Sequence, residues 1–242
     1  MLAEGKNAVN EVLNSAVKVE KILIESGAEK TLDGKILFNI INDKKINFEF
    51  CKKEVLERLS ETKRHQGFIA ILPDFKYCEV DDILDKAAKL NEPAFIVILD
   101  GITDPHNLGS IIRVSECSGA HGIIIPKNRS AEINATVMRC SAGSVNHVLI
   151  AKVANLNSAI DYLKKKNVFV YGADALGKAM YKINLKGNLA LVIGSEGDGI
   201  HRLTKELCDD IISIPMAGKV NSLNASVAAG IVLYEAVRQR RT

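Results

Sequence analysis

Apolar runs of four or five residues recur along the second part of the chain, and stretches with helical periodicity separate them. An apolar run without polar alternation is typical of a strand that is buried on both faces. Strands that alternate with helices in this way form a mostly parallel sheet. We therefore predict buried strands at residues 95–99, 122–125, 168–171, 189–193 and 211–214.

The first 72 residues show a shorter alternation of helical and strand signals, which predicts a small α/β unit. Pro73 and Pro93 bracket a polar helical stretch at 80–90. Prolines and a change in composition are common at domain boundaries. We predict three parts: an N-terminal α/β domain at 1–72, a linker at 73–90, and a C-terminal α/β domain at 91–242.

Two helices of the C-terminal domain have recognisable ends. Asp104 before Pro105 is typical of a helix N-terminus, and Gly119 of the C-terminus that follows it. Ser222 is a candidate cap for the last helix, which we expect to run to about Arg238.

Composition and charge narrow the class of protein. The chain has 242 residues, of which 47% are hydrophobic and 25% charged, so a folded globular protein is expected. Its 32 basic and 29 acidic side chains give a net charge of +3, which neither demands nor excludes RNA. No apolar run approaches the ~18 residues of a membrane span, and no secretory signal stands at the start. We expect a soluble cytoplasmic protein that does not bind a membrane.

The five cysteines are scattered, and neither they nor the histidines show metal-ligand spacing. We therefore expect reduced thiols and no metal site.

Two glycine-rich segments resemble nucleotide-binding loops without completing their patterns. Residues 172–178 match a phosphate-binding loop, but Ala179 stands where a Ser or Thr would hold magnesium. A nucleotidase that binds phosphate through Lys178 is thus a weak alternative. Residues 194–199 follow a strand with the spacing G-x-x-G-x-G, whereas the dinucleotide fingerprint is G-x-G-x-x-G.

Three polar segments stand at the carboxyl ends of predicted strands, where open α/β sheets bind their ligands. They are residues 104–113, 194–199 and 214–226. Taken singly, Asn107 and Ser222 are typical of helix caps, and Glu196 is typical of a surface turn. Their convergence at one edge of the sheet favours a functional site. Arg113 lies off the buried stripe of its helix, where a substrate or partner can reach it.

These segments resemble a known family. The segment Asn107–Arg113, the turn Gly194–Gly197, and Ile214–Met216 together with Ser222–Asn224 are similar to the three signature motifs of SpoU-type RNA ribose 2′-O-methyltransferases, in the SPOUT superfamily. The motifs occur in the family's order, and the resemblance covers essentially the whole chain.

The similarity extends to the N-terminal domain. Residues 4–9 and 65–67 resemble the branch of the family that methylates a guanosine ribose in the RNA of the bacterial large ribosomal subunit. Near the second segment, Lys63 and Arg64 form a small basic cluster. Such clusters are usually solvated surface charge, but in an RNA enzyme they are candidates for phosphate contact.

The resemblance implies an S-adenosylmethionine-dependent enzyme of the α/β class. It implies a C-terminal α/β knot, a deep trefoil with a mostly parallel sheet, and a small N-terminal α/β substrate-binding domain of the L30e type. It also implies a homodimer whose subunits share each active site. The cofactor positions correspond to Gly194, Ile214 and Leu223, and the positions around the reacting ribose to Asn107, Arg113, Glu196, Ser222 and Asn224.

Methyl transfer from a sulfonium to a ribose hydroxyl requires alignment of the oxygen and removal of one proton, but no metal or covalent nucleophile. A guanidinium has a pKa above ~12, so Arg113 is a poor general base. We interpret Arg113 as a group that grips the adjacent phosphate and stabilises the developing alkoxide. Glu196 and Asn224 then orient Arg113 and the ribose. The identity of the base, and the subunit that supplies Arg113, stay open.

Two alternatives share the fold but differ in function. The first keeps the reaction and changes the substrate from ribosomal to transfer RNA. The second is a non-catalytic RNA-binding or ribosome-assembly protein. Asn107, Arg113, Glu196 and Asn224 together argue against it, because a module without catalysis has no reason to keep all four.

Overall fold

A computed structural model describes residues 1–15, 17–219 and 222–241. Two compact units are present, and each is described by itself. The first comprises residues 1–76 and 133–143, and the second comprises 77–132 and 144–242. Residues 133–143, a short segment of the later sequence, belong to the first unit.

The first unit contains a four-stranded sheet in the order β1-β4-β2-β3. Strand β4 pairs antiparallel with both β1 and β2, whereas β2 and β3 are parallel. The elements are β1 (Leu2–Glu4), α1 (Lys6–Leu13), β2 (Lys21–Glu25), η1 (Ala28–Lys30), α2 (Leu32–Asp43), β3 (Phe48–Cys51), α3 (Lys53–Leu59), β4 (Phe68–Ile71) and α6 (Ala135–Cys140).

Glu4 fastens the loop after α3 to the first strand of this unit. Its carboxylate accepts hydrogen bonds from Ser60 Oγ at 2.7 Å, from the backbone N–H of Glu61 at 2.7 Å, and from both the backbone and the hydroxyl of Thr62. Burial raises the pKa of Glu4, but these hydrogen bonds outweigh burial and hold the pKa below its usual value.

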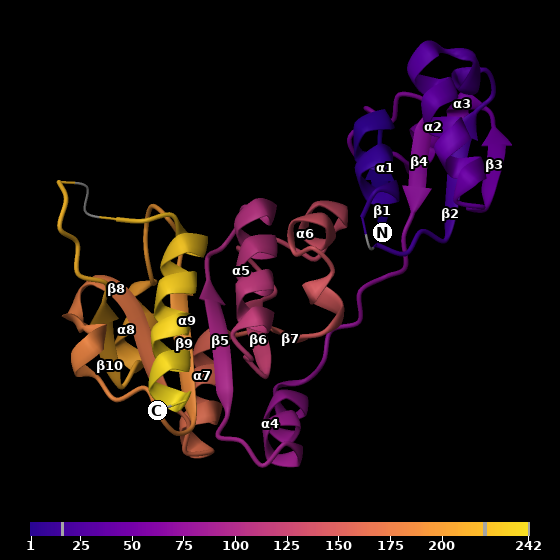
Figure 1. Cartoon of the computed structure of the whole chain (residues 1–242). Coiled ribbons are helices and arrows are strands. Elements are labelled where there is room, and N and C mark those ends of the chain that lie inside the picture. Colours follow the sequence, from indigo (N-terminus) through magenta and orange to yellow (C-terminus); the bar gives the residue numbers. More distant parts are fainter. Residues whose placement is uncertain (16, 220–221, 242) are drawn as a thin grey trace. The chain divides into compact units, whose positions relative to one another are not determined.

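The second unit is built on a six-stranded sheet in the order β10-β8-β9-β5-β6-β7, in which all paired strands are parallel (Figure 1). Its elements are α4 (Val80–Lys89), β5 (Phe95–Asp100), α5 (Pro105–Cys117), β6 (Gly122–Pro126), η2 (Ser144–Asn146), β7 (Leu149–Val153), α7 (Leu156–Lys165), β8 (Phe169–Ala179), η3 (Met180–Lys182), β9 (Leu189–Gly194), α8 (Arg202–Leu207), β10 (Asp210–Ser213) and α9 (Ala225–Arg241).

Helices cover both faces of this sheet, as the unbroken apolar runs predict. Every residue of β5 is buried. Ile96 and Ile98 pack in one core with residues of α4 and α7. The opposite face carries α5 and α9, which lie side by side. The predicted parallel α/β fold and all five predicted strands are therefore confirmed. Strand β7 was not predicted, because Lys152 interrupts its run of apolar residues.

The segment that resembles a phosphate-binding loop is part of β8 instead. The register between β8 and β10 shifts so that Ile211 pairs with Gly172 but Ile212 pairs with Lys178. A Cβ atom on Gly177 would lie 2.6 Å from the backbone of Ile211, so glycine is needed there for packing. Lys178 is paired with Asp210 at 2.7 Å. Neither residue is arranged to cradle a phosphate, and the nucleotidase alternative loses its basis.

The helix ends agree with the sequence in one case and correct it in the other. Asp104 caps α5 by accepting a hydrogen bond from the backbone N–H of His106 at 3.0 Å, as predicted. The prediction that Ser222 caps the last helix is wrong. Asn224 Oδ1 accepts from the backbone N–H of Ser226 at 2.9 Å, so Asn224 is the cap of α9. The next turn confirms this, because the N–H of Ala228 donates to the Asn224 carbonyl.

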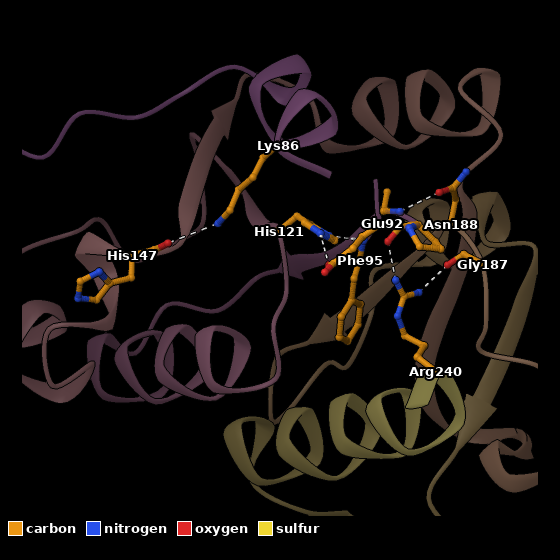
Figure 2. A network of polar contacts seen from close by, with 10 residues as sticks. Lys86, Glu92, Phe95, His121, His147, Gly187, Asn188 and Arg240 are labelled. Atoms are coloured by element: carbon orange, nitrogen blue, oxygen red, sulfur yellow. Dashed lines mark hydrogen bonds and ion pairs between the residues drawn. The ribbon is translucent and has the colours of Figure 1, made fainter. Parts of the chain in front are cut away.

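The C-terminal end of α9 is hydrogen-bonded to the residues that precede β5 and β9 (Figure 2). Arg240 donates hydrogen bonds to the carbonyls of Gly187 and Pro93, and its guanidinium lies 5.1 Å from the Phe95 ring centroid. Beside it, the buried His121 accepts from the Phe95 N–H at 3.0 Å. Arg240 therefore works as a structural tie.

Candidate active site

The loops that follow β5, β9 and β10 lie at the carboxyl edge of the sheet. Asp100 and Gly194 are register partners at the last residues of β5 and β9. After Gly194, the backbones of Ser195 and Gly199 exchange two hydrogen bonds of 3.1 Å, which close a tight turn. A Cβ atom on Gly194 would lie 2.1 Å from the Gly199 backbone, so only glycine fits where the chain folds back. This turn presents Glu196 to solvent.

Three predicted site residues meet at this edge: Asn107 in the first turn of α5, Glu196 in the turn after β9, and Asn224 at the start of α9. Asn107 Nδ2 donates to Glu196 Oε1 at 3.0 Å, and Asn224 Nδ2 donates to Asn107 Oδ1 at 2.9 Å. Asn224 Nδ2 also donates to Glu196 Oε1. We call Asn107, Glu196 and Asn224 the polar triad. Because Asn224 is also the cap of α9, the helix start fixes the triad's third member.

One side of the polar triad opens on a cavity of about 480 Å³, the β9–β10 cavity. All three predicted cofactor positions, Gly194, Ile214 and Leu223, line it, as does Ser222. Its remaining lining is Ala173, Asp174, Ala175, Leu176, Ile193, Ser195, Glu196, Gly197, Asp198, Gly199, Ile212, Met216, Ala225 and Ala228. The cavity thus joins an apolar floor to a polar rim, as small-molecule sites usually do.

Asp174 places an ion-paired carboxylate on this rim. Burial raises the pKa of Asp174, but a hydrogen bond from the Leu176 N–H at 2.9 Å and an ion pair with Lys205 at 2.9 Å outweigh burial and lower the pKa. Asp174 therefore stays ionised, beside a cavity large enough for a nucleoside-sized ligand.

A second cavity, of about 450 Å³, lies beside the first, and both are lined by residues 195–198. We call it the Asn107 cavity, because Asn107 lines it. Its other lining residues are Gly101, Ile102, Thr103, Asp104, Arg129, Ser195, Glu196, Gly197, Asp198 and His201. A shared wall that carries Glu196 allows two ligands to meet at the polar triad.

A pair of residues that was not predicted from the sequence anchors this wall. Asp100, 6% exposed, accepts from the His201 backbone N–H at 2.9 Å, and its other oxygen lies 2.8 Å from His201 Nδ1. The pair ties the residue after the turn to the end of β5. Its only sequence signal is a carboxylate at the end of a buried strand, which is common in α/β proteins.

Arg113 stands apart from the other predicted site residues. It is exposed on α5 and makes no hydrogen bond or ion pair to any residue that the structure describes. It follows Asn107 by six residues, which is about 9 Å along the helix axis and on a different face. Arg113 lines neither the β9–β10 cavity nor the Asn107 cavity.

Within the described ranges, no group of three or more His, Cys, Asp and Glu side chains is arranged to hold a metal ion. Among the helices of the same ranges, none has the length and apolar character of a membrane span.

Comparison with known protein families identifies two family models that match this chain. Residues 94–234, which contain both cavities and the polar triad, match the family model described as the SpoU rRNA Methylase family. The chain belongs to this family. Residues 2–78 match a second model, described as the RNA 2′-O ribose methyltransferase substrate-binding domain. The family that the three motifs predicted is thus confirmed, together with the RNA methyltransferase activity that defines it.

Two named relatives align with nearly the whole of this chain. It is 43% identical to the putative TrmH family tRNA/rRNA methyltransferase YacO of Bacillus subtilis (strain 168), over 98% of this chain and 94% of that protein. It is 39% identical to the 23S rRNA (guanosine-2′-O-)-methyltransferase RlmB of Escherichia coli (strain K12), over 98% of this chain and 97% of RlmB.

A solved structure confirms the fold class. The SpoU methyltransferase AviRb from Streptomyces viridochromogenes, in complex with AdoMet, superposes with a TM-score of 0.66 at 26% identity. The match covers 99% of this chain and 90% of AviRb. The predicted SPOUT fold is therefore confirmed, and a member of the family binds the predicted methyl donor.

Proposed function

We propose that this SpoU enzyme transfers a methyl group from S-adenosylmethionine to the ribose 2′-hydroxyl of a guanosine in the RNA of the large ribosomal subunit. The polar triad is the observation that carries the proposal, because it joins three family-motif residues around Glu196, which lines both of two adjacent cavities. Similarity to RlmB over both units supports the ribosomal substrate.

The β9–β10 cavity fits the methyl donor. Ile212, Ile214 and Leu223 offer apolar surface for an adenine ring, and Asp174, whose charge Lys205 balances, adds carboxylate oxygens to the rim as acceptors for a ligand's N–H and O–H groups. When bound, S-adenosylmethionine supplies an electrophilic methyl group. Gly194, Ile214 and Leu223 hold it in this proposal, and Ser222 closes the rim toward the ribose.

The polar triad orients the ribose in the proposed reaction. Glu196 accepts hydrogen bonds from two amides through one oxygen, Oε1, so its other oxygen is available to a ribose hydroxyl. Asn107 and Asn224 restrain that carboxylate from two sides. A fixed carboxylate at this position aligns the 2′-oxygen and stabilises the positive character that its proton acquires as it leaves.

Arg113 completes the site from a second copy of the chain. Because it is exposed and remote from its own polar triad, we assign it to the partner subunit's site in a homodimer. Val227 and Tyr234 support a dimer surface, since they lie seven residues apart on one face of α9 and are 49% and 50% exposed. There the guanidinium grips the phosphate next to the ribose and stabilises the developing alkoxide.

We assign recognition of the RNA to the N-terminal domain, over residues 1–72, with a linker at 73–90 and the catalytic domain at 91–242. The match to a substrate-binding family model supports this assignment. Arg64, exposed on the loop before β4, is a candidate phosphate contact. A ribosomal RNA substrate places the enzyme in the cytoplasm.

The test is transfer of labelled methyl from S-adenosylmethionine to unmodified large-subunit ribosomal RNA, with transfer RNA in parallel. We expect label in ribosomal RNA. Label in transfer RNA alone changes the substrate and keeps the reaction. No label in either RNA or in assembling ribosomal particles, despite tight RNA binding, points to a non-catalytic binding protein.

A further inference from the structure

The Asn107 cavity contains one feature that the family motifs leave unexplained, the side chain of Arg129. Arg129 stands on the loop after β6, outside all three motif segments. Its side chain is exposed and forms no hydrogen bond or ion pair with the parts of the chain that the structure describes. A guanidinium without a partner, in a cavity that borders the polar triad, is available to a ligand.

The backbone fixes the loop that carries Arg129. The φ angle of Arg129 is +56°, in the left-handed region that favours glycine. Two residues later, the Ala131 N–H donates to the Ile102 carbonyl at 2.8 Å, which joins this loop to the one that follows β5. This hydrogen bond fastens the loop, so Arg129 stays at the wall of the Asn107 cavity.

We propose that the Asn107 cavity receives the base of the target nucleotide and that Arg129 identifies it as guanine. The inference rests on the proposed function, because the ribose must lie at the polar triad for its base to enter this cavity. The volume of about 450 Å³ is within the range of small-molecule sites. A base turned out of its stack is the usual substrate form for enzymes that modify single nucleotides.

The charges in the cavity match guanine. The O6 and N7 atoms of guanine are both acceptors, and the planar fork of arginine donates to this pair with good geometry. Guanine also presents N–H donors at N1 and N2, and the carboxylates of Asp104 and Asp198 line the same cavity as acceptors. Adenine presents an amino group in place of O6, so it would direct a donor at the guanidinium. Arg129 therefore favours guanine over adenine.

The experiment compares two RNAs that differ by one atom at the target. One carries guanosine at the methylated position and the other 7-deazaguanosine, which lacks the N7 acceptor. Both are assayed for kcat and KM with the wild-type enzyme and with Arg129→Ala. The control variant is Lys127→Ala. Lys127 is an exposed cation on the same loop, but its side chain does not line the cavity.

For the wild type, we expect 7-deazaguanosine, which keeps O6 and loses only the N7 acceptor, to lower kcat/KM about 5- to 10-fold, the lower end of the range for a bidentate base contact. Arg129→Ala loses both contacts, so its kcat/KM on guanosine should fall about 5- to 100-fold, and it should no longer distinguish the two RNAs. Lys127→Ala should distinguish them as the wild type does. If Arg129→Ala lowers kcat/KM equally for both RNAs and 7-deazaguanosine still lowers it as in the wild type, Arg129 contacts phosphate and the proposal is wrong.

A binding measurement separates this inference from the proposed function. Guanosine monophosphate and adenosine monophosphate are titrated separately into the wild type and into Arg129→Ala. S-adenosylhomocysteine is present to fill the neighbouring cavity. We expect the wild type to favour the guanine nucleotide by about tenfold and Arg129→Ala to bind both alike. Equal binding by the wild type overturns the base assignment whether or not methyl transfer occurs. Failure of wild-type transfer to guanosine RNA, with this preference intact, counts against the proposed function alone.

Discussion

Asn224 Nδ2 lies 2.9 Å from Asn107 Oδ1, although 117 residues separate the two positions in the chain. One residue caps the final helix and the other stands in the first turn of α5. Both also bind Glu196. The polar triad therefore requires α5, the turn after β9 and the start of α9 to reach their final places together.

Asn224 has two roles that a matched pair of variants can separate. Asn224→Ala removes the cap of α9 and should lower the free energy of unfolding by about 1 kcal/mol. It also removes two contacts of the triad, so we expect kcat to fall at least tenfold. Asn155→Ala is the control, because Asn155 caps α7 by accepting from the Ser158 N–H at 3.1 Å. It should cost similar stability and leave kcat unchanged. Equal kcat for the two variants would contradict the triad's role.

A shared active site predicts that two inactive variants restore each other. Arg113→Ala and Glu196→Ala should each be inactive alone. After mixed refolding at equal amounts, half of the dimers carry one intact site of two, so about a quarter of wild-type activity should return. A mixture of Asn107→Ala with Glu196→Ala is the control and should stay inactive, because both residues belong to one triad. No recovery in the first mixture would mean that Arg113 does not act across subunits.

The tie at the end of α9 predicts a loss of stability from Arg240→Ala. The variant loses the hydrogen bonds to the carbonyls of Gly187 and Pro93 and the contact with Phe95, which together should lower the free energy of unfolding by about 2 kcal/mol. Arg241→Ala removes a neighbouring exposed guanidinium and should cost less than about 0.5 kcal/mol. Urea unfolding followed by circular dichroism measures both. Equal effects would show that the tie contributes nothing specific.

The Glu4 carboxylate predicts a stability difference that depends on pH. Because its folded pKa lies below the ordinary value of 4.5, the ionised form stabilises the fold above that value. This stability is lost as the pH falls through the folded pKa. After allowance for solvent screening, Glu4→Gln should cost about 1 kcal/mol at pH 7 and progressively less below pH 4.5. Glu20→Gln, at an exposed position, should show no such trend, and a Glu4→Gln cost independent of pH would contradict the assignment.

The cysteines should differ strongly in reactivity. Burial raises the pKa of the Cys208 thiol to about 12 and that of Cys78 to about 11, so little thiolate exists at pH 8. Cys117 is exposed. With iodoacetamide at pH 8, mass spectrometry of peptides should show Cys117 modified first and Cys208 last. In urea the order should disappear. Alkylation of folded Cys208 as fast as Cys117 would contradict its burial.

Most of the catalytic unit could be predicted because its strands are unbroken apolar runs. Where a run is diluted, as at Lys152 in β7, the pattern weakens and the strand was missed. The cap of α9 could not be chosen from the sequence, since Ser222 and Asn224 are both good caps. Tertiary hydrogen bonds to Asn107 and Glu196 favour Asn224, and no local pattern contains them.

Some residues of the candidate site could be predicted from the sequence, and others could not. Asn107, Glu196 and Asn224 were predicted because they stand in recognisable motifs. Arg129 and the pair of Asp100 with His201 were not, because their significance depends on loops that meet only in the folded unit. The glycines of residues 172–178 resemble a phosphate-binding loop for a different reason, since Gly177 is required by packing against β10.

The central claim is that the polar triad directs methyl transfer to a ribose oxygen. It is tested most directly by nucleoside mass spectrometry of large-subunit ribosomal RNA after incubation with S-adenosylmethionine and either the wild type or Glu196→Ala. We predict 2′-O-methylguanosine from the wild type and at least a hundredfold less from Glu196→Ala. A methylated base in place of a methylated ribose, or equal product from both proteins, would contradict the claim.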